Sequence, residues 1–260
     1  MNIAIITGAS SGMGMEFARQ IDRNLRKTDE IWLLARRREP MEELARSMQT
    51  KTSIIPIDIT DEKELKQFEE VLEVSSPRIT MLVNCAGVGF HGEFFEQSAD
   101  ELTAMLRLNV MALTMLTKIC LPYMRKGSKI VQFASGAAFL PQADFAVYAA
   151  SKTYVYSFSR ALGQELKSRG VNVTTVCPGP VDTPFLEQAY GDVSRMGALK
   201  RLTTVSAACV VSKAIADCKR GRTVSVCGLP MKALYLATQG LQSCVLACIS
   251  HAAATTAPYS

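Results

Sequence analysis

The sequence predicts an α/β fold, with a single doubly wound parallel sheet of about seven strands flanked by helices. Two patterns predict it. Short β-branched runs alternate with longer amphipathic stretches from end to end, as in strands joined by crossover helices. The short runs are almost uniformly apolar, which is typical of strands covered on both faces. No linker rich in Pro, Gly or Ser interrupts residues 1–260, so we expect one domain.

The expected elements follow one another in strict order. Each strand is a short β-branched run, and each helix is an amphipathic stretch beside it. The strands are Ile3–Thr7, Ile31–Ala35, Ser53–Ile57, Met81–Asn84, Lys129–Ala134, Asn172–Cys177 and Thr223–Cys227. The helices lie near residues 13–26, 39–49, 61–73, 99–125, 148–169, 203–219 and 231–249. The segment 184–202 is expected to cover a substrate as a lid.

Composition narrows the function. The net charge of +5 is spread through the chain, with a local concentration of positive charge only at Arg36–Arg38, which indicates a small anionic ligand and argues against nucleic acid. The eight cysteines lie mostly in apolar segments, without Cys-x-x-Cys spacing or a secretion signal, so we expect a reduced, cytoplasmic protein. Only two histidines are present, and no metal site is expected. The longest apolar stretch, near Ala233–Ile249, is short against the roughly 20 residues that span a bilayer.

A glycine-rich segment, Thr7–Gly14, lies between the first strand and the first helix. Gly8, Gly12 and Gly14 would let the chain turn tightly and bring backbone close to a pyrophosphate. The amides of the following helix supply an anion site. An ordinary glycine-rich turn is the alternative, but the position directly after a strand favours a dinucleotide site. The other expected cofactor contacts in this segment are Ser10, Ser11 and Met13.

The end of the second strand predicts the choice of cofactor. Ala35 stands where an NAD-binding fold usually places an acidic residue for the ribose 2′-hydroxyl, and Arg36 follows it. The missing carboxylate and the added guanidinium predict that NADP(H) is preferred over NAD(H). In the alternative interpretation, Arg36–Arg38 is the solvated start of a helix.

Two further strand ends carry candidate cofactor contacts. Asp58 follows the third strand, where it could accept a hydrogen bond from adenine or cap the helix opening at Asp61. Asn84, Ala86 and Gly87 close the fourth strand. Small residues there allow backbone to approach a cofactor, but they also suit any tight turn.

Tyr148 and Lys152 stand four residues apart on an expected helix, so the phenol and the ammonium point into the same space. A nearby positive charge favours the phenolate, and we expect Lys152 to lower the pKa of Tyr148, a candidate general acid/base. Ser135 ends the fifth strand, at the edge where ligands of open α/β sheets bind. Asn109 interrupts an apolar helix face. A buried structural asparagine is the alternative interpretation there.

Together these motifs resemble those of the short-chain dehydrogenases/reductases with Thr-Gly-x-x-x-Gly-x-Gly and Tyr-x-x-x-Lys, over residues 1 to about 228. The resemblance implies a Rossmann-type dinucleotide-binding fold. It implies a catalytic tetrad of Asn109, Ser135, Tyr148 and Lys152, with Tyr148 and Lys152 also touching the cofactor. It further implies contacts to the nicotinamide from a Pro-Gly segment, at Pro178, Gly179, Val181 and Thr183.

The resemblance also implies roles. Tyr148 would donate a proton to the substrate oxygen, and Ser135 would bind the same oxygen. Lys152 would bind the nicotinamide ribose, and Asn109 would hold a water that returns protons. Three departures stand out. Ser11 replaces a basic residue of many NADP-preferring members, Ala134 replaces a common first serine, and an apolar helix follows Gly228, as in hydroxysteroid and long-chain ketoacyl reductases.

The expected function is therefore NADP-dependent interconversion of a ketone and a secondary alcohol. Aliphatic and aromatic residues of the lid, including Phe185, Met196 and Leu199, favour an apolar substrate such as a steroid or an acyl chain. The family resemblance implies a homodimer or homotetramer. Two alternatives belong to other classes: a cofactor-binding regulator without turnover, and an interaction protein that docks through its last helix. We expect the apolar face of that helix to pack over the protein's own substrate pocket or across a subunit interface. Membrane-surface docking is less favoured, because that helix lacks a Lys/Arg-rich polar face.

Overall fold

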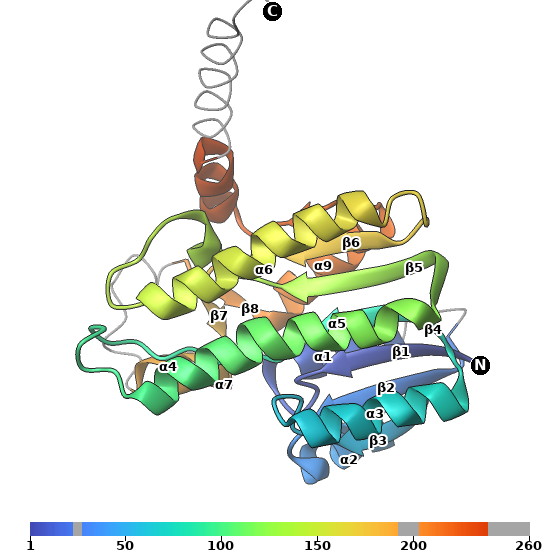
Figure 1. The fold of residues 1–260 in the computed structure, drawn as a ribbon. Helices are drawn as coiled ribbons and strands as arrows, with labels where there is room; N and C mark the ends of the chain where they lie inside the picture. Colours follow the sequence, from blue (N-terminus) through green and yellow to red (C-terminus); the bar gives the residue numbers. More distant parts are fainter. Residues whose placement is uncertain (23–27, 192–202, 239–260) are drawn as a thin grey trace, which may run out of the picture.

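A seven-stranded parallel sheet forms the centre of the molecule (Figure 1). The structure, a computed structural model, describes residues 1–22, 28–191 and 203–238. The strand order is β3-β2-β1-β4-β5-β6-β9, and every neighbouring pair is parallel. The predicted fold class is confirmed. The strands are β1 Asn2–Thr7, β2 Glu30–Ala35, β3 Lys51–Pro56, β4 Arg78–Asn84, β5 Met124–Phe133, β6 Asn172–Val176 and β9 Val224–Ser225.

Helices cover both faces of the sheet. Alternate residues of β1 enter different cores, because successive strand side chains point to opposite faces. Ala4 and Ile6 pack with the first set of helices, whereas Ile3 and Ile5 pack with the second. The first set is α1 Gly12–Asp22, α2 Arg38–Arg46 and α9 Ala207–Lys219. The second set, in front of the sheet in Figure 1, is α3 Glu62–Ser75, α5 Leu113–Cys120 and α6 Ala146–Glu165.

The sheet reverses its order between β1 and β4. The chain goes from β1 to β2 and β3 on one side, then crosses to β4 on the other, so the carboxyl ends of β1 and β4 diverge into a crevice. This is where ligands bind in open α/β sheets. Thr7 closes the crevice floor, because its Oγ1 accepts hydrogen bonds from the backbone N–H of Cys85 and of Ala86, both at 3.0 Å.

The helix expected near 99–125 is interrupted by a π-helical segment. It begins with α4 Ala99–Leu106, continues as η1 Arg107–Ala112 in π-helical form, and returns to α-helix in α5. Ser98 and Glu101 form a capping box at its start. Residues 99–123 are long and apolar enough to span a membrane by composition, and a core helix meets the same criteria. Here Leu116 packs against the sheet and is fully buried.

Several elements were not predicted. α7 Pro184–Tyr190 begins the segment predicted to be a lid, and β7 Val181–Asp182 pairs with β8 Val205–Ser206. Residues 192–202, with Met196 and Leu199, lie outside the described residues. Residues 229–238 are helical, whereas the rest of the predicted last helix also lies outside them. β5 starts five residues earlier than expected, at Met124 and not at Lys129.

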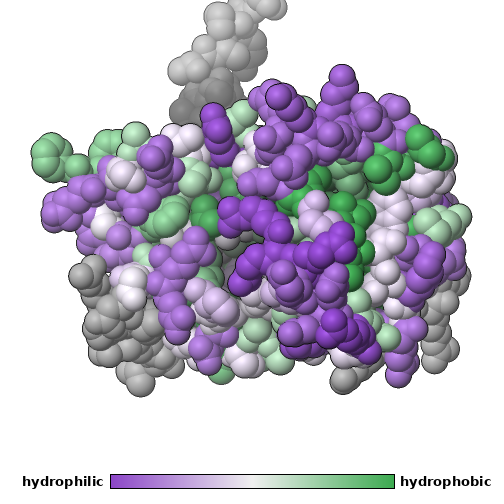
Figure 2. Space-filling view, turned by 90° about the horizontal axis from the view of Figure 1, so that it is seen from below, coloured by the Kyte–Doolittle hydropathy of each residue, from purple (hydrophilic) through white to green (hydrophobic). Residues whose placement is uncertain are grey.

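The molecular face at the β3 end of the sheet is mainly hydrophilic, with smaller hydrophobic areas between the charged side chains (Figure 2). Two apolar residues of α3, Val71 and Val74, are 48% and 89% exposed. Isolated apolar residues are normal on protein surfaces and indicate no binding site by themselves.

Candidate active site

One large cavity, of about 1160 Å³, opens at the carboxyl ends of the central strands. It is lined by the glycine-rich loop, the ends of β2, β4 and β5, the Pro178–Thr183 segment, α4, α7 and the helix at 229–238. All the predicted site residues line this cavity except Asn84 and Asn109. The structure therefore brings together motifs that are more than 170 residues apart in the sequence.

The glycine-rich loop is close-packed and positions the start of α1. Gly8 has φ +68°, and a Cβ on it would lie 3.0 Å from the Cα of Ala86. A Cβ on Gly14 would lie 2.3 Å from the carbonyl oxygen of Gly8. Neither position accepts a side chain. The N-terminus of α1 consequently faces the cavity, with Ser10, Ser11, Gly12 and Met13 at its wall, and offers an anion site.

Two arginines line the far side of the loop. Arg37 donates a hydrogen bond from Nη2 to Ser10 Oγ at 3.3 Å, so it faces the loop. Arg36 lines the cavity and has no hydrogen bond or ion pair to any other described residue. Arg38 instead pairs with Glu42 one turn along α2, at 3.3 Å. The solvated-helix interpretation thus fits Arg38, and Arg37, the exposed N-cap residue of α2, both opens that helix and contacts the loop.

Asp58 lines the cavity, and the capping role falls to another residue. Its Oδ1 accepts hydrogen bonds from the backbone N–H and the hydroxyl of Thr60, at 2.9 and 2.7 Å. Asp61 is the N-cap of α3 and accepts from the amides of Lys63 and Glu64. Asp58 thus does not cap α3, and it lines the cavity in which the predicted hydrogen bond from adenine would form.

Asn84, expected to contact a cofactor, does not line the cavity. Its side chain is buried on the α5 side of the sheet, where Nδ2 donates to Thr117 Oγ1 and to Gln132 Oε1, both at 2.9 Å. Asn84 ties β4, β5 and α5 together behind the cavity. Ala86 and Gly87, two and three residues later, do line the cavity.

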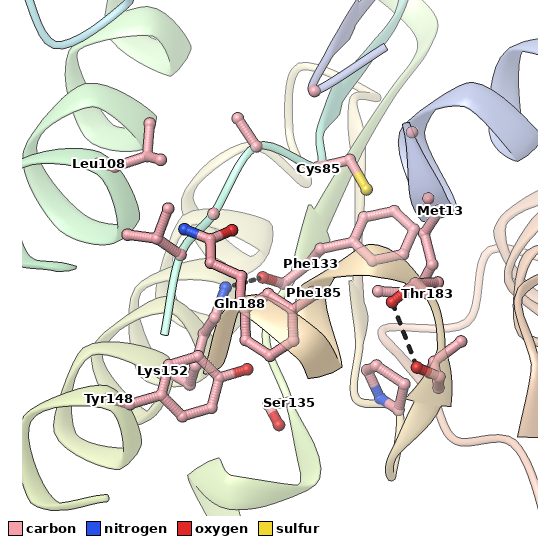
Figure 3. Close-up of a pocket in the computed structure, with 18 of the residues that line it drawn as sticks. Met13, Cys85, Leu108, Phe133, Ser135, Tyr148, Lys152, Thr183, Phe185 and Gln188 are labelled. Carbon is pink, nitrogen blue, oxygen red and sulfur yellow. Dashed lines mark hydrogen bonds between the residues drawn. The ribbon is translucent and has the colours of Figure 1, made fainter. Parts of the chain in front are cut away.

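Tyr148 and Ser135 face each other across the cavity (Figure 3). The phenol is 7% exposed and lies among other aromatic rings, with Phe145 at 4.6 Å and Phe185 at 5.6 Å between ring centroids. Burial in this apolar environment raises the pKa of Tyr148 to about 12, against a smaller lowering effect of its hydrogen bond with Ser135. The phenol therefore holds its proton throughout the physiological pH range.

Lys152 does not lower the pKa of Tyr148 in this structure, contrary to expectation. Its Nζ lies 5.8 Å from the centre of the Tyr148 ring and donates instead to the carbonyl oxygen of Phe133 at 3.0 Å (Figure 3). Burial lowers the pKa of Lys152 to about 8. Burial is the largest cause of both shifts, and the ammonium donates to a backbone carbonyl oxygen and not to the phenol.

Asn109 is fully buried in the π-helical segment, behind the cavity wall. Nδ2 donates to the Val88 carbonyl at 2.8 Å and to Ser151 Oγ at 3.1 Å, while Oδ1 accepts from the Val88 N–H at 3.0 Å. A Cβ on Gly87 would lie 3.1 Å from Asn109 Oδ1 and 3.2 Å from Lys152 Nζ. π-Helical turns are frequent at functional sites. In this one, the Asn109 side-chain amide bonds the backbone of Val88, close to Lys152.

The sequence predicted only part of the cavity around Tyr148, namely the lid segment that contains Phe185 and Tyr190 and the last helix. Phe145 and Tyr190 pack beside Tyr148, with His91 4.6 Å from Tyr190 between ring centroids. Polar side chains also line this end, from residues Asp100, Arg107, Gln142 and Gln188. The helix at 229–238 adds Pro230, Met231 and Leu234. No motif marks these positions, because they come from loops and helix ends that converge only in the fold.

Met231 is the most closely inserted of these residues. A Cβ on Gly136 would lie 2.2 Å from Met231 Cε, and one on Gly179 would lie 2.9 Å from Met231 Cγ. The Met231 side chain thus fills the space that two glycines leave open, between the turn after Ser135 and the Pro178–Gly179 segment. The prediction that the last helix packs over its own cavity agrees with this described part of it.

Proton transfer to or from an oxygen in the cavity is what these groups can perform. A protonated phenol, a hydroxyl and an ammonium meet beside an anion-binding helix N-terminus. Among the described residues, no cluster of three or more His, Cys, Asp or Glu could hold a metal ion.

Comparison with known proteins shows the family of this chain. The family model described as short chain dehydrogenase matches residues 2–193. An uncharacterised oxidoreductase of Staphylococcus epidermidis is 28% identical over 199 residues, covering 75% of this chain and 85% of that protein. Among solved structures, a short-chain dehydrogenase from Sphingobium yanoikuyae in complex with NADPH has a TM-score of 0.79 and 28% identity, covering 94% and 96% of the two chains.

A second solved structure is the bulky-bulky ketone specific alcohol dehydrogenase from Comamonas testosteroni. Its TM-score is 0.74 at 26% identity, and the match covers 94% of each chain. Neighbours with lower identity include a Burkholderia phymatum enzyme with NAD, at 22%, which shows the fold alone.

Proposed function

Because the chain belongs to the short-chain dehydrogenase family and is an NAD(P)-dependent oxidoreductase, we propose that it interconverts a bulky apolar ketone and its secondary alcohol with NADP(H). The observation that carries the proposal is the Tyr148–Ser135 pair in one cavity with the glycine-rich loop. When bound, the nicotinamide supplies or accepts the hydride at the substrate carbon.

The loop and its neighbours fit a dinucleotide. The glycines at 8 and 14 keep the loop free of side chains, and the α1 N-terminus would hold the pyrophosphate. Arg36 has no partner among the described residues, so its guanidinium is available for a 2′-phosphate. The Sphingobium enzyme, which is 28% identical, was solved with NADPH, and this supports the preference for NADP(H).

In the reducing direction, the Tyr148 hydroxyl donates its proton to the substrate oxygen, and Ser135 Oγ orients that oxygen. The Lys152 ammonium lies 5.8 Å from the centre of the Tyr148 ring and donates to the Phe133 carbonyl oxygen; in the proposed reaction it would turn toward the phenol oxygen and stabilise the phenolate left behind. Asn109 Oδ1 and Lys152 Nζ both border Gly87, so a water between them would be held to return a proton. In the oxidising direction each proton moves the other way.

The volume and the apolar lining of the cavity favour a large substrate. Phe145, Phe185 and Tyr190 surround the Tyr148 ring, and Met231 and Leu234 add apolar surface opposite them. The Comamonas relative, named for bulky-bulky ketones, supports the same size class. The polar groups of Gln142 and Gln188 would orient one end of such a molecule.

Two apolar helix faces support a homo-oligomer. Met111, Met115 and Tyr154 are 56%, 49% and 39% exposed, and the Thr114 hydroxyl joins Tyr154 at 3.0 Å, so the three residues lie on adjoining faces of two helices. A cytoplasmic location agrees with the six described cysteines, which are all free thiols.

Purified protein with NADPH tests the proposal directly. Loss of nicotinamide absorbance should occur with bulky apolar ketones, steroids or ketoacyl esters, and more slowly with small ketones. Wild-type protein that binds NADPH but turns over no member of such a panel, in either direction, would favour the alternative of a regulator without turnover.

A further inference from the structure

Cys209 and Cys227 bring two sulfur atoms into contact away from the cavity. Their Sγ atoms are 3.3 Å apart, although the residues are 18 positions apart in the sequence. Cys209 is exposed in the first turn of α9, and Cys227 follows β9 at 7% exposure. A disulfide needs an S–S distance of about 2.05 Å, so a small rotation of side chains would join them.

We propose that Cys209 and Cys227 form a reversible disulfide when the protein meets a hydroperoxide. The exposed Cys209 thiolate attacks one peroxide oxygen, which breaks the O–O bond, gives a sulfenic acid and releases an alkoxide that takes up a proton. The Cys227 thiol then gives up its proton and attacks the sulfenic sulfur; the S–S bond forms, the S–O bond breaks, and the departing hydroxyl takes up a proton and leaves as water. Two thiols are oxidised by two electrons, and the peroxide is reduced to an alcohol and water.

The surroundings assign these two roles. Cys209 is the sulfur that solvent reaches, so it is the one that a peroxide meets first. Burial raises the pKa of Cys227 to about 11, with Cys209 beside it adding to the effect. Cys227 therefore stays a protonated thiol, protected from the peroxide and in contact with the sulfur that it must attack.

The disulfide would join two segments that border the cavity. Cys209 follows β8, which pairs with β7 beside Thr183. Cys227 precedes the helix that places Met231 against Gly136 and Gly179. Oxidation would thus fix the start of that helix to α9. This thiol chemistry does not depend on the proposed reaction, so either can fail without the other.

Peptide mapping after treatment with hydrogen peroxide tests the proposal. Cleavage after Lys and Arg places Cys209 in the peptide 202–213 and Cys227 in the peptide 223–232. We expect one cross-linked species containing both peptides, lost on reduction with dithiothreitol and absent from Cys209→Ser and from Cys227→Ser. Cys218, buried in α9, is the matched control, and Cys218→Ser should still form the species.

Cross-linking should also raise the Tm of the wild-type protein, because it restrains the chain between the two cysteines. Cys209→Ser should show no such rise. Peroxide that converts Cys209 to a sulfinic or sulfonic acid, or joins it to another cysteine, would overturn the proposal. Complete cross-linking without a change in Tm would contradict the proposal that the disulfide fixes the start of the helix to α9.

Discussion

At the scale of single residues, burial shifts the pKa values of a phenol and an amine in opposite directions. The pKa of Tyr148 is raised and that of Lys152 is lowered, mainly by desolvation in both cases. Desolvation disfavours the charged form of each group. The consequence is a phenol that keeps its proton until a substrate oxygen takes it, beside an amine that is still charged at neutral pH.

Replacement of Tyr148 by Phe should remove turnover and leave NADPH binding nearly unchanged, because the hydroxyl acts on the substrate. General acid/base catalysis contributes roughly 10²–10⁴-fold, and we expect a loss of at least that size. Steady-state rates and a fluorescence titration with NADPH measure the two effects. Tyr123→Phe, on the short η2 turn Leu121–Tyr123, is the control. A Tyr148→Phe protein with most of the wild-type rate would exclude Tyr148 as the acid.

Carbonyl reduction should slow as pH rises above about 8. The Lys152 pKa is lowered to about 8, so the ammonium charge is present below this pH and lost above it. The Tyr148 pKa of about 12 keeps the phenol protonated throughout that range. A pH profile of kcat/KM, which reports groups of the free enzyme, should therefore fall through about pH 8. A profile that stays flat to about pH 10 would contradict the role given to the Lys152 charge.

Cofactor choice should depend on Arg36. Arg36→Ala should weaken NADPH binding by roughly 1.5–3 kcal/mol, or about 10- to 100-fold, and leave NADH binding unchanged. Arg38→Ala is the matched control, because Arg38 pairs with Glu42 in α2. Equilibrium titrations with both cofactors give the comparison. Equal affinity of the wild type for NADH and NADPH would show that Ala35 and Arg36 do not determine the preference.

At the scale of elements, the sequence predicts best what depends on periodicity. All seven strands of the main sheet were predicted, because a strand buried on both faces leaves an apolar run that little else produces. The glycine positions were predicted for a similar reason, since their backbone contacts exclude any side chain. The position of the Asn84 side chain outside the cavity was not predicted, because its partners Thr117 and Gln132 come from distant parts of the sequence.

The elements that were missed depend on tertiary contacts. The π-helical turn around Asn109 leaves the apolar periodicity almost unchanged, so a continuous helix was the natural prediction. β7 and β8 have two residues each, too short for any pattern. β5 extends back to Met124 because its register against β4 shifts there, which is decided by pairing and not by propensity.

The helix at 229–238 should influence which substrates are accepted. Met231→Ala would open space beside Ser135, and we expect kcat/KM for a bulky ketone to rise roughly tenfold relative to a small one. Leu236→Ala is the control, since Leu236 is 66% exposed on the same helix. The ratio of the two kcat/KM values in each variant is the measurement. A ratio unchanged from wild type in Met231→Ala would mean that this side chain does not limit the substrate.

At the scale of the whole molecule, topology places the site and leaves other surfaces for assembly. The cavity lies at the carboxyl ends of the strands, where the strand order reverses. The segments that follow these strands form its walls. The outer faces of α5 and α6 take no part in it. Exposed Met115 of α5 and Tyr154 of α6, with Met111 of the adjoining η1, would find the same apolar faces on a second copy of the chain by symmetry.

Charges placed on these faces should separate the copies. Met111→Glu combined with Met115→Glu would bury carboxylates in an apolar contact, so we expect the wild type to be a dimer or tetramer and the variant to be smaller. Light scattering gives the mass, and NADPH titration checks that the variant is folded. Val74→Glu on α3, at a position 89% exposed, is the control and should keep the wild-type mass. A monomeric wild type would contradict the prediction that these faces join copies of the chain, because both apolar faces would then be exposed to water in the native protein.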